Sequence, residues 1–289
     1  MQFVGAILSG ILVSICFNLR EDFVTKKIGS RLLQLGIVLL GFTISIDYAV
    51  RTSLDYFPWV SLFVVCVFVV GMLFSKALKL NQRSALLVVS GTAICGGTAM
   101  VAIAPIIKAK PQELVNALTL IFVLNTISII LFPFVGMYLD LSQIEFGAWS
   151  AFAIHDTSSV VGAAYIFGDE AVQVATTLKL GRTLWLIPLV LCMSWVYRGR
   201  RGDVKFPVFI PLFFVAIVAN SVFDLDNTLV EHVKSAAKVF FLLGLFSIGT
   251  EIDRSSLQQV SLRTAILALS LWTIIIPSSL ALIRFYARF

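Results

Sequence analysis

The sequence predicts an all-α, polytopic membrane protein with about 8–10 transmembrane helices, two of them discontinuous or re-entrant. Of the 289 residues, 59% are hydrophobic and only 13% are charged, whereas soluble domains average about 25% charged residues. The apolar residues gather in stretches close to the roughly 20 residues that a helix needs to cross a bilayer. Because the connections between these stretches are short, we expect residues 1–289 to form a single transmembrane domain.

Ten candidate membrane segments follow one another along the chain. They cover residues 1–18, 32–50, 59–75, 85–107, 114–138, 148–167, 183–197, 206–223, 239–252 and 264–283. The first segment lacks a basic leader and a small-residue cleavage site, so we expect a retained helix and not a removed signal peptide. The four cysteines lie in apolar segments without paired spacing, so no disulfide, metal site or other cofactor is predicted. The net charge of +6 comes without a basic patch interleaved with aromatic residues, which excludes nucleic acid as a partner.

Residues 85–107 do not read as an ordinary membrane helix. Their first half is rich in small and hydroxyl-bearing residues, namely Ser90, Gly91, Thr92, Cys95, Gly96, Gly97 and Thr98. Each glycine weakens a helix by roughly 1 kcal/mol relative to alanine. Non-helical backbone is tolerated at membrane depth only where protein or a water-filled cavity covers it. The segment therefore predicts a break or a re-entrant turn beside a polar cavity.

Residues 148–167 form the second unusual segment. It carries five polar residues in a row: His155, Asp156, Thr157, Ser158 and Ser159. An acid at the bilayer centre usually marks a pathway, a proton relay or a paired site. The simpler alternative is a helix N-cap, with Asp156 or Thr157 accepting hydrogen bonds from the next turn.

The distribution of basic residues tests whether these two segments cross. With the N-terminus outside, ten crossing segments place 13 Lys and Arg inside and 9 outside. If both unusual segments enter and leave on one side, Lys108 and Lys110 move inside and the distribution becomes 15 against 7. The positive-inside rule favours the second arrangement, although broken helices that cross have the same composition.

A basic pair, Lys179 and Arg182, follows the second segment on one helical face. Either the pair snorkels to the interface, or one member faces the cavity as a counter-ion to Asp156 or as a ligand for an anion. Three further polar residues are more typical of helix packing or of the interface than of a ligand site: Asn125, Ser128 and Glu251. The stretches LGIVLLG (35–41) and LGLFSIG (243–249) match in their glycines, which indicates close helix packing or an internal repeat.

GTAICGGTAMVAIAPIIKA, IHDTSSVVGAAYIFGDEA, the KLGR of 179–182 and LGIVLLGF at 35–42 resemble the YeiH-type (UPF0324) family of bacterial inner-membrane proteins, which carries the label sulfate exporter. The resemblance covers nearly the whole chain. It implies a multi-pass transporter of the bacterial inner (plasma) membrane, distantly similar to antiporters and bile-acid symporters with inverted repeats and crossed broken helices. It also implies a further hydrophobic segment before the position of Met1. Carried over by motif, the site would comprise 91–98, 155–159 and the pair Lys179 and Arg182.

These patterns predict a secondary transporter that exports a small anion such as sulfate by alternating access. Two half-helix N-termini meeting at the midplane would attract an anion. The expected substrate-binding residues are Gly91, Thr92, Cys95, Gly96, Gly97, Thr98, Thr157, Ser158, Ser159, Lys179 and Arg182. His155 and Asp156 would take up the coupling ion, H⁺ or Na⁺. Membrane lipid is the other expected partner, and a homo-oligomer is compatible with the sequence.

Three alternatives stay open at this point. Asp156 and backbone carbonyls could bind sodium or a proton in a carrier of another solute. Cys95 as nucleophile, with His155 as base and Asp156 as the orienting acid, would make an intramembrane hydrolase. Adjacent residues on a helix do not face each other, however, so no enzyme is expected. A structural scaffold has no use for HDTSS within a membrane segment.

Overall fold

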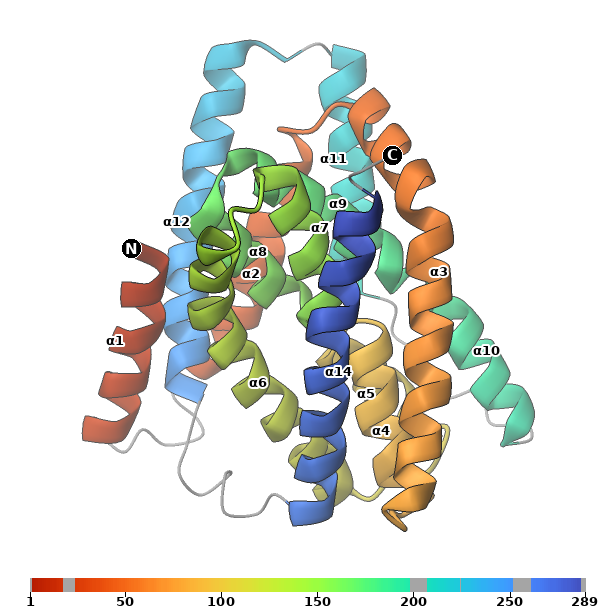
Figure 1. Cartoon of the computed structure of the whole chain (residues 1–289). Helices are drawn as coiled ribbons and strands as arrows, with labels where there is room; N and C mark the ends of the chain where they lie inside the picture. The colour runs from red at the N-terminus through yellow and green to blue at the C-terminus, as the bar shows by residue number, and fades with distance from the viewer. Residues whose placement is uncertain (1, 18–23, 198–206, 224, 252–260, 287–289) are drawn as a thin grey trace.

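In the computed structural model, the described part of the chain consists of α-helices joined by turns and short connections, without a strand (Figure 1). It comprises residues 2–17, 24–197, 207–223, 225–251 and 261–286. The helices are α1 (Gln2–Phe17), α2 (Val24–Gly41), α3 (Ile46–Ala77), α4 (Gln82–Ala93), α5 (Gly97–Ile103), α6 (Pro111–Tyr138), α7 (Gln143–Ala153), α8 (Thr157–Phe167), α9 (Asp169–Thr183), α10 (Leu186–Val196), α11 (Phe209–Phe223), α12 (Asn227–Glu251) and α14 (Leu262–Tyr286). The predicted all-α polytopic class is confirmed.

Five helical stretches of the described chain are long and apolar enough to cross a membrane. They are α3, α6, α9 continued by α10, α12 and α14, while α1, α2, α8 and α11 contain shorter apolar stretches. Several predicted boundaries were wrong. The segment 32–50 spans the end of α2 and the start of α3, and the segment 183–197 omitted α9. Charged residues caused the second error, because the hydropathy of α9 is lowered by side chains that the fold buries.

The first unusual segment is a re-entrant hairpin made of α4 and α5. The side-chain amide of Asn81, which precedes α4, donates a 2.6 Å hydrogen bond to Glu113 at the start of α6. The hairpin therefore begins and ends at the same end of the molecule. Within it, Gly91 lies against the side chain of Met100, where a Cβ would overlap the methionine.

The second unusual segment is a re-entrant hairpin made of α7 and α8. The side-chain oxygen of Gln143, the first residue of α7, accepts a 3.0 Å hydrogen bond from the amide of Glu170 in the first turn of α9. This hairpin also returns to the end from which it came. Because α6 connects the two hairpins and is long enough to cross a membrane, they enter from opposite ends (Figure 1).

Re-entrance of both hairpins selects the arrangement that counts 15 basic residues inside and 7 outside. Two of those 7, Lys179 and Arg182, are buried in the structure and belong to neither side. We call the end where α4 and α6 begin the inner end, because the positive-inside rule assigns it to the cytoplasm. The end where α7 and α9 begin is the outer end. Six of the basic residues counted for the inner side lie outside the described residues: Arg20, Arg198, Arg200, Arg201, Lys205 and Arg254.

The helices pack as two bundles. A four-helix bundle contains α1, α2, α11 and α12, and a hairpin bundle contains α3 to α10 with α14. Glycines bring α2 and α12 together, because a Cβ on Gly36 would lie 2.8 Å from Phe241 and one on Gly244 would overlap Leu33. The glycines shared by 35–41 and 243–249 thus serve close helix packing. Between the bundles, α1 and α2 contact α8, α1 contacts α6, and α11 contacts α3.

Candidate functional site

The tips of the two hairpins meet in the interior of the molecule. Between α4 and α5, Gly96 has φ of +65°, a conformation that disfavours any residue with a side chain. A Cβ at Gly96 would lie 3.3 Å from the Cβ of Asp156, which connects α7 to α8. The breaks that the glycines and the HDTSS run predicted therefore lie side by side.

Arg182 ties the two hairpins together. Its Nε donates a 2.8 Å hydrogen bond to the carbonyl oxygen of Ala93, and a second nitrogen donates to Thr92, both at the end of α4. Its Nη1 donates to Ala151 at 3.0 Å and to Phe152 at 2.8 Å, at the end of α7. Helix C-termini carry partial negative charge on unpaired carbonyls. One guanidinium therefore satisfies the ends of two half-helices.

Lys179 has a similar function one turn earlier on α9. Its ammonium donates a 2.6 Å hydrogen bond to the carbonyl oxygen of Ile154 and a 3.4 Å bond to that of Ala151. The two cations are 0% and 1% exposed, so they do not snorkel to an interface. A buried charge costs several kcal/mol unless it is paired or hydrogen-bonded. The carbonyls at the hairpin ends supply that compensation.

Asp156 is the N-cap of α8. One of its carboxylate oxygens accepts hydrogen bonds from the amide and the hydroxyl of Ser159, each 3.1 Å long. Asp156 therefore forms the helix N-cap that the sequence offered as the simpler interpretation of the HDTSS run. The carboxylate thereby occupies the end of α8 that attracts anions.

His155 faces away from this cap and toward α6. Its Nδ1 lies 3.3 Å from the side-chain oxygen of Asn125, and the ring is 1% exposed. Neither its Nε2 nor the amide nitrogen of Asn125 has a hydrogen-bond partner. The buried hydroxyl of Thr92 also lacks one. These polar groups surround the tips, but no series of hydrogen bonds among them connects His155 to Asp156 in the described residues.

A cavity of about 470 Å³ lies between the bundles on the inner side of the tips. Three of the predicted site residues line it: Gly97, Thr98 and Asp156. The other predicted residues are placed around the tips without lining this cavity, namely Gly91, Thr92, Cys95, Gly96, His155, Thr157, Ser158, Ser159, Lys179 and Arg182. Asp156 is the one ionisable side chain among the lining residues that the structure describes.

Sequence reasoning missed the wall that faces these residues. Ser30 and Gln34 from α2 line the cavity, together with Phe209 at the start of α11. Because Ser30 and Gln34 are four residues apart, both side chains lie on one helix face. The side-chain amide nitrogen of Gln34 lies 3.5 Å from the Ser30 hydroxyl oxygen. This pair was a usable signal, but the predicted segment 32–50 began after Ser30. Of the lesser candidates, Ser128 bonds within α6, and the Glu251 side chain lies outside the described residues.

Comparisons with known proteins identify the family. The family model described as "Conserved hypothetical protein 698" matches residues 2–268. The chain is 40% identical to a UPF0324 membrane protein of Photobacterium profundum, over 90% of this chain and 78% of the relative. It is 35% identical to a UPF0324 membrane protein of Bacteroides thetaiotaomicron, over 97% of this chain and 86% of the relative. No solved structure matches significantly. The chain therefore belongs to the UPF0324 family of multi-pass bacterial inner-membrane proteins.

Proposed function

We propose that the chain is a secondary transporter that exports a small solute by alternating access. The observation that carries this proposal is a cavity at the tips of two opposed re-entrant hairpins, with polar side chains in its lining and one wall from each helical bundle. Binding sites of transporters lie where discontinuous helices meet near the midplane. A cavity walled by two bundles changes its access when one bundle moves against the other.

The cavity lies on one side of the tips, and tightly packed aromatic side chains lie on the other. Its lining residues on α2, α5, α6 and α11 lie toward the inner end. On the outer side, α8 packs directly against the four-helix bundle, where the ring of Tyr165 lies 4.9 Å from Phe3 and 5.3 Å from Phe241, measured between centroids. This arrangement corresponds to an inward-facing carrier.

A small anion such as sulfate is the substrate that we propose to test first. The uncharged donors Ser30, Gln34 and Thr98 line the cavity and suit oxyanion oxygens. An ionised Asp156 repels an anion at this place, whereas a protonated Asp156 does not. Anion binding and proton binding at Asp156 should therefore be coupled. Lys179 and Arg182 support the site by holding the tips, because their polar hydrogens point at backbone carbonyls.

A sodium- or proton-coupled carrier of another solute is the second candidate, and a specific observation favours it. Asp156 gives the described lining one acidic side chain and no basic one, which suits a cation. The hydrolase alternative gains no such support, because His155 pairs with Asn125 and Asp156 pairs with Ser159. The proposal therefore assigns no catalytic reaction to the chain.

Sulfate counterflow in proteoliposomes, with and without a pH gradient, tests the proposal. The comparison includes the wild type, Asp156→Asn, Asp140→Asn and empty vesicles. The substitution Asp140→Asn makes the same chemical change at the exposed turn after α6 and is the matched control. We expect saturable uptake that responds to the gradient in the wild type and in Asp140→Asn, with the response lost in Asp156→Asn. Uptake equal to that of empty vesicles, from folded protein, would exclude sulfate.

Repeating the experiment with a sodium gradient in place of the pH gradient separates the second candidate from the first. Sodium-driven binding or uptake that Asp156→Asn abolishes, in the absence of any sulfate flux, would favour cation coupling. Sulfate flux that ignores sodium and follows the pH gradient would favour the anion carrier.

A further inference from the structure

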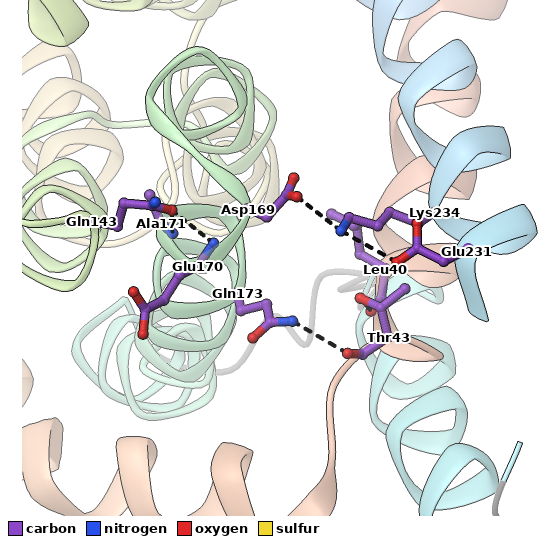
Figure 2. A network of polar contacts seen from close by, with 9 residues as sticks. All are labelled: Leu40, Thr43, Gln143, Asp169, Glu170, Ala171, Gln173, Glu231 and Lys234. Atoms are coloured by element: carbon purple, nitrogen blue, oxygen red, sulfur yellow. Dashed lines mark hydrogen bonds and ion pairs between the residues drawn. The ribbon is translucent and has the colours of Figure 1, made fainter. Parts of the chain in front are cut away.

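The two bundles are joined by polar contacts at the outer end, away from the cavity (Figure 2). The ammonium of Lys234, in the second turn of α12, lies 2.8 Å from a carboxylate oxygen of Asp169, the first residue of α9. Lys234 belongs to the four-helix bundle and Asp169 to the hairpin bundle. This ion pair thus crosses the boundary that must open if the cavity is to face outward.

A second contact joins α9 to the segment that links the two bundles. The side-chain amide of Gln173, one turn after Asp169 on α9, donates a 3.3 Å hydrogen bond to the carbonyl oxygen of Thr43. Thr43 lies just after α2 in the link to α3. Both contacts therefore start on the first two turns of α9; one ends on α12 of the four-helix bundle and the other on the link that leaves α2, as Figure 2 shows.

The start of α9 is itself firmly held within the hairpin bundle. The side-chain oxygen of Gln143 on α7 accepts hydrogen bonds from the amides of Glu170 at 3.0 Å and Ala171 at 3.4 Å. The first turn of α9 must therefore move together with the α7–α8 hairpin that carries Asp156. Any movement that separates this hairpin from the four-helix bundle at the outer end has to break the pair of Asp169 with Lys234.

We infer that Asp169 and Lys234, supported by Gln173, form an outer latch that favours the inward-facing state. The inference rests on the proposed alternating-access function and specifies which contacts must break during it. The ion pair of this latch contributes little free energy, because the side chains of Lys234 and Asp169 are 31% and 66% exposed. Solvent-exposed ion pairs change an equilibrium by only a small factor, so the outward-facing state stays within reach.

The chain offers a matched control for this pair. Glu231 also approaches Lys234, at 3.7 Å, but it lies three residues away on the same helix. Its loss removes a charge beside Lys234 and leaves the ion pair of Lys234 with Asp169 in place. Glu231→Gln and Asp169→Asn therefore each remove one carboxylate charge near the Lys234 ammonium. Only Asp169→Asn removes an ion pair that joins the two bundles.

The test measures how fast an impermeant maleimide, added from outside to right-side-out vesicles, labels a cysteine placed in the cavity as Thr98→Cys. The exposed native cysteines Cys16, Cys66 and Cys192 are replaced by serine. Asp169→Asn and Lys234→Gln should each raise the outside labelling rate about two- to fivefold, the population shift expected from one exposed ion pair. Glu231→Gln should leave the rate unchanged, and the exchange of Asp169→Lys with Lys234→Asp should lower the rate again.

Each alternative outcome has a distinct meaning. Equal outside labelling in Asp169→Asn, Lys234→Gln and Glu231→Gln would overturn the latch, while alternating access would stand if outside labelling occurs at all. Labelling from the inside only, in every variant, would overturn both the latch and the proposed function. As an independent check, a short bis-maleimide joining Asp169→Cys to Lys234→Cys should stop outside labelling and leave inside labelling intact.

Discussion

The Nε atom of Arg182 donates a 2.8 Å hydrogen bond to the carbonyl oxygen of Ala93, a residue that lies 89 positions earlier in the chain. The same guanidinium bonds Phe152 at the end of the other hairpin. The contact between two hairpins that enter from opposite ends thus depends on one side chain that neither hairpin contains.

Arg182→Met should strongly destabilise the protein. The substitution leaves carbonyl oxygens of both hairpins unpaired in a buried place, which should lower the free energy of unfolding by about 3 kcal/mol or more. Arg182→Lys should recover part of the loss, because an ammonium cannot span both hairpin ends as the guanidinium fork does. Thermal unfolding in detergent provides the measurement. Arg51→Met, at an exposed position of α3, is the control, and equal melting of the two Met variants would refute the assigned role.

Gly96→Ala should disturb the junction of the tips. The backbone conformation of Gly96, which is unfavourable for residues with a side chain, costs an alanine about 1–3 kcal/mol, and the new methyl would press on Asp156 from 3.3 Å. Gly181→Ala is the matched control, because no atom lies within 4 Å of its added Cβ on helix α9. We expect a lower melting temperature for Gly96→Ala alone. A Gly96→Ala protein as stable as Gly181→Ala would contradict the strained turn.

Two substitutions of Asp156 should separate folding from coupling. Asp156→Asn keeps a side-chain oxygen that can cap α8, whereas Asp156→Ala removes the cap at a cost of about 1 kcal/mol. We therefore expect Asp156→Ala to melt below the wild type and Asp156→Asn to melt close to it. Both variants should lose the response of transport to a pH gradient. A response retained in Asp156→Asn would argue against proton binding at this carboxylate.

Re-entrance of the hairpins predicts which surface positions share a side of the membrane. Cysteines at Arg83 and Lys110 flank the α4–α5 hairpin and should be labelled from the inner side only. Cysteines at Asp140 and Glu170 flank the α7–α8 hairpin and should be labelled from the outer side only. Lys110, Asp140 and Glu170 are exposed and Arg83 is half-buried, so labelling at the three exposed positions tests topology and not burial. Opposite labelling of Arg83→Cys and Lys110→Cys would mean that the first hairpin crosses.

The sequence was sufficient to locate the breaks but not their partners. Glycines around Gly96 and the polar row from His155 are local signals, because they are incompatible with a plain membrane helix. The functions of Lys179 and Arg182 depend on carbonyls of remote segments, and backbone atoms leave no trace in sequence. Composition alone could not decide between crossing and returning. The count of basic loop residues favoured returning, and the structure agrees.

The cavity wall was the least predictable part of the site. Ser30 and Gln34 occur on a helix whose polar residues look like those of any helix near the membrane surface. Their spacing of four was a local signal for one helix face, but the position of that face opposite the hairpin tips follows from the packing of α2, which no local pattern encodes. Likewise, charged residues near the start of α12 hid its true length, because Lys234 has its partner on another helix.

The shared guanidinium has a mechanical consequence. Since the ends of α4 and α7 are fastened to the same side chain of α9, neither tip can be displaced without dragging the other. A ligand held at Gly97, Thr98 and Asp156 would accordingly move with both hairpins as one rigid body. Its distance to Ser30 and Gln34 on α2 would change during that movement.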